Sequence, residues 1–297
     1  MANTAITPEL PIAEAGRSIM ANELAIIQSH WPALRLSADV TAVHETRKAL
    51  RRTFTLFKVF APYYAPGTLQ NRHDELRKVM RRLAPCRDVA VFQLKLAAYN
   101  AAAERPLNDL ADYWGYRQMR ADGTLREYLD RRSTISIVDR FAHLAQTPGA
   151  GLPDESPKTA PLLVRHVLPG LIFNRIGNVR AWGDLLPTAT LKQFHQLRIQ
   201  FKELRYTMSF FEDIIGDNAG QLMDALRGIQ EILGDLNDAS VAIDLLEEMK
   251  HLRAESTIYT SFQHSELERL MAEFRPLYAE FDRPKIRREL AVTLANL

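Results

Sequence analysis

The chain has 297 residues, of which 46% are hydrophobic and 25% charged. Its 13 Gly and 15 Pro are too few for a collagen-like or Pro/Gly-rich disordered protein, and 38 basic against 36 acidic residues exclude disorder driven by charge. A single cysteine excludes a disulfide framework and a cysteine-based zinc site. We therefore expect a soluble cytoplasmic protein, without a membrane span because Arg165, His166 and Pro169 interrupt the longest apolar stretch.

Apolar residues recur at helical spacing along the chain, and strand-like alternation is nearly absent, which predicts an all-α fold. Thr190 and Gln193 have the spacing of a capping box, Gly216 suits a helix end, and Pro62 ends the helix before it. In the first half we predict helices over residues 12–30, 39–61, 70–84, 88–103 and 107–132. In the second half we predict helices over residues 160–183, 190–215, 218–234, 238–254 and 258–281.

A stretch rich in Pro, Gly and Ser near the midpoint predicts an exposed linker, and similar sequences lie on either side of it. VHETRKALRRTFTLF from Val43 matches FHQLRIQFKELRYTMSFF from Phe194 at an offset of 151, and LRKVMRRLAPCRDVAV from Leu76 matches LRGIQEILGDLNDASV from Leu226 at an offset of 150. Two matches in the same order indicate an internal duplication and predict a pseudo-twofold pair of helical bundles. The predicted parts are a first repeat over 1–147, a linker over 148–160 and a second repeat over 161–297.

The first repeat carries a basic stripe on one predicted helix. Residues 1–147 have a net charge of +6, whereas residues 148–297 have −4. Within about 100° of arc, with Arg52 just beyond, lie His44, Arg47, Lys48, Arg51 and Lys58. To the opposite, apolar arc we assign Leu50, Phe54, Leu56, Phe57 and Phe60. A solvated face normally mixes charges of both signs, so a stripe with the single acid Glu45 favours an anion site over a solvated face.

The second repeat has the same arrangement. Its basic arc holds His195, Arg198, Lys202 and Arg205, and its apolar arc holds Phe194, Leu197, Phe201, Leu204 and Met208. More positive charge in the first repeat comes from Arg77, Arg81, Arg82 and Arg87. Asp88 and Asp238 stand where a new helix is predicted to begin, so each is interpreted as an N-cap, as an anchor that orients a stripe arginine, or as both. The recurrence of the stripe favours a functional role over chance.

Several chemistries are excluded by missing patterns. His44 lacks the second histidine at i+4 of a zincin helix, and the sequence has no glycine-rich phosphate loop and no G-x-S-x-G motif. Cys86 lies next to Arg87 but has no partner base, which favours a structural role. We expect no catalytic residues, no metal site and no cofactor.

The two His-x-x-Arg helices, the Arg87–Asp88 step and the run LGDLNDASVAI from Leu233 resemble the CHAD family, an α-helical domain named for its histidines. The resemblance extends from about Ile12 to Phe281 and implies two four-helix bundles related by an internal twofold, a basic central groove or pore, and binding of inorganic polyphosphate. Two positions depart from the family pattern: Phe54 stands opposite Arg205, and Asn237 replaces the arginine before Asp238. The implied ligand-facing residues are His44, Arg47, Arg51, His195, Arg198, Lys202 and Arg205.

A linear polyphosphate carries about one negative charge per phosphate and no bases, so a row of Arg and Lys at helical spacing suits it. We predict a non-catalytic polyphosphate-binding protein, located in the cytoplasm on polyphosphate granules, with Asp88 and Asp238 as orienting residues. The alternatives are a surface or scaffold protein of polyhydroxyalkanoate granules, a nucleic-acid or nucleotide-binding module, and a metal-binding protein. The predicted binding set is His44, Arg47, Lys48, Arg51, Arg52, Lys58, Arg77, Arg81, Arg82, Arg87, His195, Arg198, Lys202, Arg205 and Tyr206, of which Tyr206 alone could stack on a base.

Overall fold

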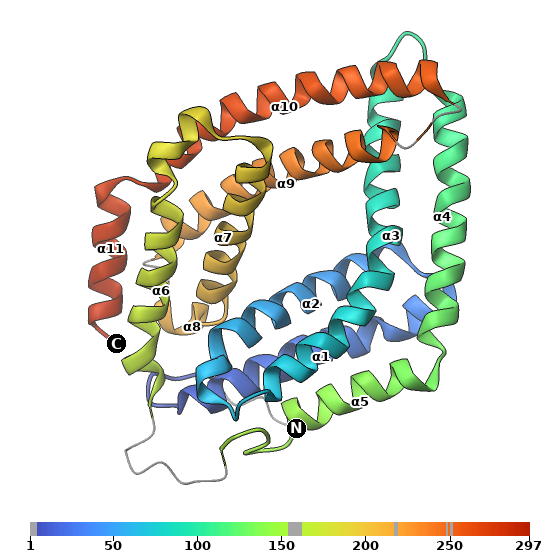
Figure 1. Cartoon of the computed structure of the whole chain (residues 1–297). Helices are drawn as coiled ribbons and strands as arrows, with labels where there is room; N and C mark the ends of the chain where they lie inside the picture. The colour runs from blue at the N-terminus through green and yellow to red at the C-terminus, as the bar shows by residue number, and fades with distance from the viewer. Residues whose placement is uncertain (1–4, 154–161, 217–218, 248, 250–251) are drawn as a thin grey trace. The chain divides into compact units, whose positions relative to one another are not determined.

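The computed structural model describes residues 5–153, 162–216, 219–247, 249 and 252–297. These residues form α-helices joined by turns and short 3-10 helices, and they contain no β-strand (Figure 1). A single isolated bridge pairs Pro11 with Leu163. The predicted all-α fold is confirmed. Residues 154–160 of the predicted linker lie outside the described part of the chain.

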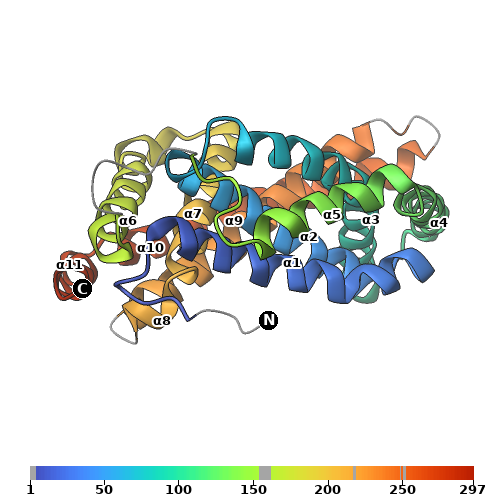
Figure 2. The ribbon, with the colours of Figure 1, turned by 90° about the horizontal axis from the view of Figure 1, so that it is seen from below.

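The chain divides into two compact units, Met1–Val164 and Arg165–Leu297. The first unit contains α1 (Ile12–Ser37), α2 (Val40–Phe60), η1 (Ala61–Tyr63), α3 (Thr68–Ala102), α4 (Asn108–Leu129) and α5 (Arg132–Gln146). Helix α1 packs against α2, α4 and α5, and α3 packs against the same three helices (Figure 2). The helices α2, α4 and α5 therefore each lie against both α1 and α3.

The second unit contains α6 (Val164–Arg180), η2 (Gly183–Thr188), α7 (Leu191–Ser209), α8 (Glu212–Ile215), α9 (Gly220–Glu247), α10 (Arg253–Phe281) and α11 (Pro284–Ala295). Helix α9 packs against both α7 and α10. The internal duplication and the twofold relation between the units stay predictions.

The helix ends follow from local chemistry. Asp39 caps α2 by accepting a hydrogen bond from the Ala42 backbone N–H at 2.8 Å, and α2 ends at Phe60, before Pro62. The predicted capping box of α7 is confirmed, because the Thr190 and Gln193 side chains bond each other's backbone N–H groups.

Gly216 has the positive φ of 64° expected at a helix end, and its N–H donates to the Glu212 carbonyl. The helix that it ends is the short α8, because the predicted helix over 190–215 already breaks after Ser209.

Two predicted helix breaks are wrong. Helix α3 continues through Pro85, and α9 continues through residues 235–237. Pro85 is exposed, so its missing N–H leaves the carbonyl one turn earlier open to water, and the helix tolerates it. Asp88 and Asp238 consequently lie inside helices, which rules out the N-cap interpretation for both. The sequence patterns also missed α5 and α11, and the helix predicted to reach residue 132 ends at Leu129.

The apolar arc of α2 forms part of the core of the first unit. Leu50, Leu56, Phe57 and Phe60 are buried, as predicted. Helices α1 and α2 approach closely at Gly16, where a Cβ atom would lie 2.6 Å from the Phe60 ring. With its apolar side fixed in this core, α2 presents its basic residues to α3 and to the surface.

Candidate functional site

Helices α2 and α3 meet at an ion pair between Arg47 and Asp88. The Arg47 Nη2 atom lies 3.5 Å from the Asp88 Oδ1 atom. The Arg47 side chain is 13% exposed and that of Asp88 is 43% exposed. This contact is the one that Asp88 would need in order to anchor a stripe arginine, the second of its two predicted roles.

The remaining Arg47 donors are buried without a partner. Within the described residues, neither Nε nor Nη1 of Arg47 has a hydrogen-bond acceptor. Burial lowers the pKa of Arg47 to about 10; Asp88 opposes this effect, whereas the positive charges of Arg51 and Arg87 reinforce it. Arg47 therefore stays protonated at neutral pH in a place where its charge is poorly solvated. A buried donor without an acceptor costs about 1–3 kcal/mol, and an incoming anion would recover that cost.

His44 lies one turn before Arg47 and experiences the same positive charge. Its pKa is lowered from the usual value, first by burial and then by Arg87, and more weakly by Arg51 and Lys48. Glu45 opposes the shift, with its carboxylate 3.7 Å from the His44 ring. Because Arg87 belongs to α3 and the other two cations to α2, positive charge from both helices converges on His44.

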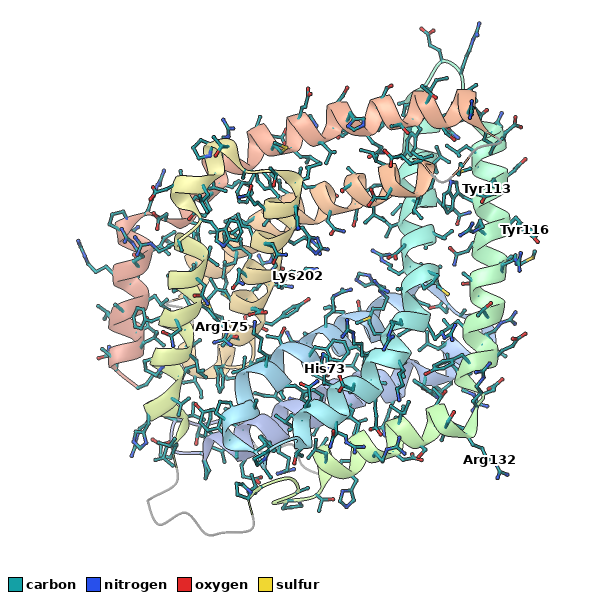
Figure 3. The ribbon with its side chains drawn as sticks, in the orientation of Figure 1. His73, Tyr113, Tyr116, Arg132, Arg175 and Lys202 are labelled. Atoms are coloured by element: carbon teal, nitrogen blue, oxygen red, sulfur yellow. The ribbon has the colours of Figure 1, made fainter. Side chains whose placement is uncertain are left out.

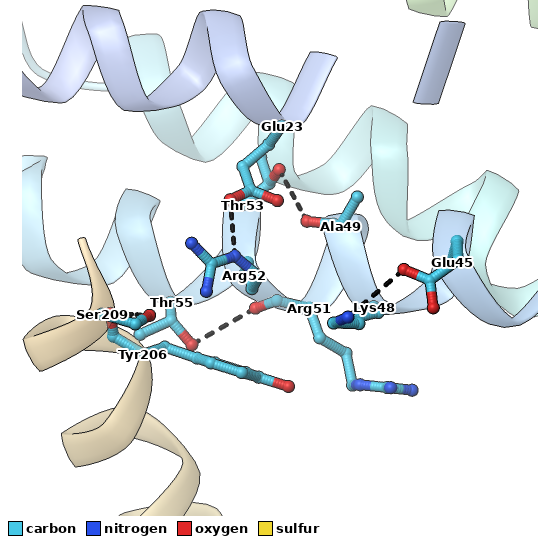
Figure 4. Close-up of polar contacts among 10 residues, drawn as sticks. All are labelled: Glu23, Glu45, Lys48, Ala49, Arg51, Arg52, Thr53, Thr55, Tyr206 and Ser209. Atoms are coloured by element: carbon cyan, nitrogen blue, oxygen red, sulfur yellow. Dashed lines mark hydrogen bonds and ion pairs between the residues drawn. The ribbon is translucent and has the colours of Figure 1, made fainter. Parts of the chain in front are cut away.

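The other predicted cations of α2 are placed differently. Lys48 is exposed and contacts Glu45 at 3.3 Å, and such a surface pair contributes little to stability (Figure 4). The Nε atom of Arg51 is buried and has no hydrogen-bond acceptor among the described residues. Lys58 is exposed in the last turn of the helix.

Arg52 does not belong to the stripe. Its Nε atom pairs with the Glu23 carboxylate of α1 at 2.5 Å, and Glu23 is only 2% exposed (Figure 4). Burial raises the pKa of Glu23 in spite of the opposing charge of Arg52. Five residues after Arg47, Arg52 is turned by about 140° from it, toward α1, in line with its predicted place just beyond the stripe; its predicted contact with polyphosphate stays a prediction.

Phe54 also departs from its predicted place. Its position seven residues after Arg47 and three after Arg51 puts it on the basic side of α2, and its side chain is only half-buried. There it packs edge to face against the ring of His73, with the ring centroids 4.7 Å apart. His73 is labelled in Figure 3. The sequence patterns assigned Phe54 to the apolar arc, and they did not single out His73.

The basic residues of α3 point in more than one direction. Arg77, Arg81 and Arg82 are exposed, and Arg87 is half-buried near His44 and Arg47. The guanidinium of Arg82 lies over the Tyr128 ring of α4 at 5.3 Å, which directs it toward α4.

In the second unit, polar side chains join α7 and α9, the helices that carry the matched segments from Phe194 and Leu226. His195 Nδ1 lies 3.0 Å from Asn237 Oδ1. Arg205 Nε donates to Gln230 Oε1, and Gln230 Nε2 donates to the Phe201 carbonyl at 3.1 Å. Neither Gln230 nor Asn237 was among the predicted site residues, although Asn237 directly precedes Asp238 in the matched segment.

The other predicted residues of the second repeat lie on or next to the same face of α7. Arg198 and Lys202 are half-buried, and Asp238 accepts a hydrogen bond from Asn237 Nδ2 at 3.4 Å. Tyr206 is only 3% exposed, and the Arg205 guanidinium lies 5.1 Å from its ring centroid. The predicted apolar arc is confirmed, because Phe194, Leu197, Phe201, Leu204 and Met208 are all buried.

A cleft of about 430 Å³ opens beside His195, between α7 and α9. Phe194, Leu233 and Leu236 are among its apolar lining residues, and Lys192 and Asp244 provide one charge of each sign. The cleft is therefore nearly neutral, in contrast to the α2 stripe of the first unit.

The described residues contain no group of three or more His, Cys, Asp or Glu side chains that could hold a metal ion. Cys86 is buried, and its burial together with Asp122 raises the pKa of the thiol to about 12, so it is protonated at neutral pH. In the described ranges no helix combines the length and the apolar character that crossing a bilayer requires.

Comparison with known proteins gives a family and a fold. The chain matches the CHAD domain family over residues 18–247. It is similar to the crystal structure of the CHAD domain from the plant Ricinus communis, with a TM-score of 0.70 and 20% identity, over 98% of this chain and 95% of that chain. It is also similar to PptA from Streptomyces chartreusis, with a TM-score of 0.69 and 16% identity, over 91% and 100% of the two chains. No curated protein sequence matches.

At these identities the two solved structures establish a common fold. The family match covers more than half of the sequence and includes α2, α3, α7 and α9, the four helices that carry the basic residues described above. The chain belongs to the CHAD domain family.

Proposed function

We propose that the protein binds inorganic polyphosphate, without catalysing a reaction on it, through the surface where α2 meets α3. We call this surface the α2–α3 basic face and define it by His44, Arg47, Arg51, Lys58, Arg77 and Arg87. The observation that carries the proposal is Arg47, whose guanidinium is buried among other cations and has two donors without an acceptor in the described residues.

The arrangement suits an extended polyanion better than a compact one. From His44 to Lys58 the helix rises by about 21 Å, and Arg47 and Arg51 lie between them on one side. Polyphosphate carries repeated charge along its length and can contact such a row at several phosphates. The CHAD resemblance implies the same ligand class.

The second repeat contributes through His195, Arg198, Lys202 and Arg205. Its share of the binding energy is smaller, because Arg205 already donates to Gln230 and His195 contacts Asn237. The helix paired with α7 also carries two further acids: at the repeat offset of 150, Glu231 stands where α3 has Arg81, and Asp235 stands where it has Pro85. Binding to granule polyphosphate would place the protein on polyphosphate granules.

Titration calorimetry with long-chain polyphosphate tests the proposal. Wild-type protein should bind, and its affinity should fall by orders of magnitude between about 50 and 200 mM salt, because each phosphate contact releases counterions. Arg47→Gln should weaken binding at least about tenfold, since a partly desolvated charge–phosphate contact is lost. The matched control is Arg140→Gln, whose exposed guanidinium on α5 pairs with Glu75; it should bind as the wild type does.

A flat salt profile would overturn the electrostatic mechanism. Retention on polyester granules at high salt would instead indicate binding through apolar contacts. Equal polyphosphate affinities of wild type and Arg47→Gln would show that the α2–α3 basic face is not the binding site.

A further inference from the structure

We propose that His73, whose ring packs against Phe54, is an additional phosphate contact of the α2–α3 basic face. We propose further that it makes polyphosphate binding by the first repeat stronger under acidic conditions. The inference rests on the proposed function and deepens it. It concerns the one position of the α2 stripe where the first repeat lacks the basic residue that the second repeat has.

Phe54 corresponds to Arg205 at the repeat offset of 151. Arg205 puts a permanent positive charge at this place on α7. Phe54 provides no charge, but its ring supports the imidazole of His73 from the neighbouring helix at a centroid distance of 4.7 Å and an interplanar angle of 62°. A titratable side chain thus lies next to the position that a fixed cation occupies in the other repeat.

The register of α2 and α3 extends the basic face to His73. Arg47 contacts Asp88 and Phe54 contacts His73, so the two helices run antiparallel, with one contact toward each end of the shared surface. At about 100° per residue, His73, Arg77, Arg87 and Asp88 lie within about 100° of arc on α3. His73 therefore shares the side of α3 that faces the stripe, and it lies against Phe54, three residues beyond Arg51 along α2.

The ring of His73 is held in a defined orientation. Its Nδ1 atom lies 3.1 Å from the Asp74 carboxylate, and its side chain is 28% exposed. Within the described residues the structure records no hydrogen bond or ion pair for Nε2. With Nδ1 directed to a carboxylate, Nε2 is the atom left to meet a phosphate oxygen.

Charged groups of both signs lie near His73. On α3 they are Asp74, which contacts the ring, and Arg77, one turn further along the helix. On α2 the cations flanking Phe54 are Arg51 and Lys58. From α5, Arg140 reaches α3 but pairs with Glu75, on the other side of the helix. A bound polyphosphate would neutralise these cations and add negative charge, so binding and protonation of His73 should support each other.

The test compares His73→Gln with wild type by calorimetry using long-chain polyphosphate at pH 5.5 and pH 8.0. We expect His73→Gln to weaken binding about fivefold at pH 5.5 and less than about twofold at pH 8.0, as the loss of one partly exposed charge–phosphate contact predicts. The salt dependence of the variant should become shallower by about one contact at pH 5.5 only. His143→Gln, at an exposed position on α5, is the matched control and should leave both values unchanged.

A second variant keeps the test independent of folding effects. Phe54→Arg combined with His73→Gln places a fixed cation where Arg205 stands in the other repeat, and it should restore the affinity at pH 5.5 and raise it at pH 8.0. The imidazole NMR signal of His73 should also titrate at higher pH with polyphosphate than without it.

Unchanged affinity of His73→Gln at both pH values, in a protein that still binds polyphosphate, would overturn the role of His73 alone. Equal weakening at both pH values, without rescue by Phe54→Arg, would reduce His73 to a packing residue. Absence of binding by the wild type would instead overturn the proposed function.

Discussion

Arg47 and Asp88 face each other across α2 and α3, with Arg47 Nη2 3.5 Å from Asp88 Oδ1. The contact occupies one end of the guanidinium and leaves Nε and Nη1 without an acceptor in the described residues. Asp88 also opposes the lowering of the pKa of Arg47 that burial causes. A single carboxylate thus contacts the arginine and favours its charged form, while its Nε and Nη1 donors have no acceptor in the described residues.

Asp88→Asn should lower the free energy of unfolding by about 1 kcal/mol, because Arg47 then keeps a poorly solvated charge without its counterion, and Asp88 is itself nearly half exposed. Urea denaturation measures the change. A double-mutant cycle with Arg47→Met should give a coupling energy of about 0.5–1 kcal/mol. Asp139→Asn, at an exposed position on α5, is the control. Strictly additive effects of Asp88→Asn and Arg47→Met would show that Arg47 and Asp88 are not coupled.

Charge reversal should separate the ligand-facing side of each helix from its core side. Arg51→Glu and Lys202→Glu should each weaken polyphosphate binding more than about tenfold, because a repulsive contact replaces an attractive one. Both should keep wild-type helicity and melt within a few degrees of wild type. Leu50→Asp should unfold the protein, because Leu50 is fully buried and an isolated charge there costs several kcal/mol.

Circular dichroism and calorimetry on the same samples check this prediction. If Arg51→Glu unfolds the chain and the surviving folded fraction still binds normally, the assignment of α2's faces is wrong.

Glu23 should give stability a dependence on pH. Its folded-state pKa is raised above the unfolded value of about 4.3, so the folded state binds more protons in the window between the two values. Stability from this group is present below the unfolded pKa and is lost as pH rises through the folded pKa. The free energy of unfolding of wild type, minus that of Glu23→Gln, should therefore decrease from pH 4 to pH 7. Urea denaturation at several pH values measures both quantities. An increase of this difference with pH would contradict the raised pKa of Glu23.

Binding should also depend on pH through His44. The lowered pKa of His44 makes its unliganded imidazole largely neutral at pH 7, and a bound polyanion would favour the proton. Affinity should therefore rise as pH falls, and the rise should continue below the ordinary histidine value of about 6.5. His44→Gln together with His195→Gln should reduce this effect.

Zinc titration over the same pH range tests the alternative that the histidines are metal ligands. A ligating imidazole must be neutral, so zinc affinity would fall over the same pH range. Zinc binding that the double substitution abolishes, combined with polyphosphate binding independent of pH, would assign the histidines to a metal.

The structural features that could be predicted from the sequence are those with a local pattern of residues. The apolar arc of α7, its capping box and the basic stripe of α2 follow from spacing within about one to four turns, and the structure contains them. The N-cap and anchor roles of Asp88 were both open; the continuity of α3 through Pro85 excludes the N-cap, and the anchor role stays a prediction, supported by the contact with Arg47.

The parts that sequence missed depend on neighbours distant in the chain. Arg52 is paired with Glu23, 29 residues away, and His195 contacts Asn237, 42 residues away. Helical spacing gives the direction of a side chain but not what another helix presents to it. Phe54 was misplaced because an aromatic residue was assigned to the core by its chemistry, although its angle puts it on the basic side, where His73 covers it.

The most direct test of the central claim is a competition between long-chain polyphosphate and single-stranded DNA for the intact protein at matched phosphate concentration and about 100 mM salt. Polyphosphate should displace labelled DNA, while DNA should leave labelled polyphosphate bound, because the α2–α3 basic face offers a row of charges, the Phe54 ring within it is half-buried against His73, and Tyr206 is buried. Arg47→Gln should lose most of the polyphosphate binding and little of any residual DNA binding. Equal displacement by DNA, or a preference for DNA, would contradict polyphosphate as the ligand.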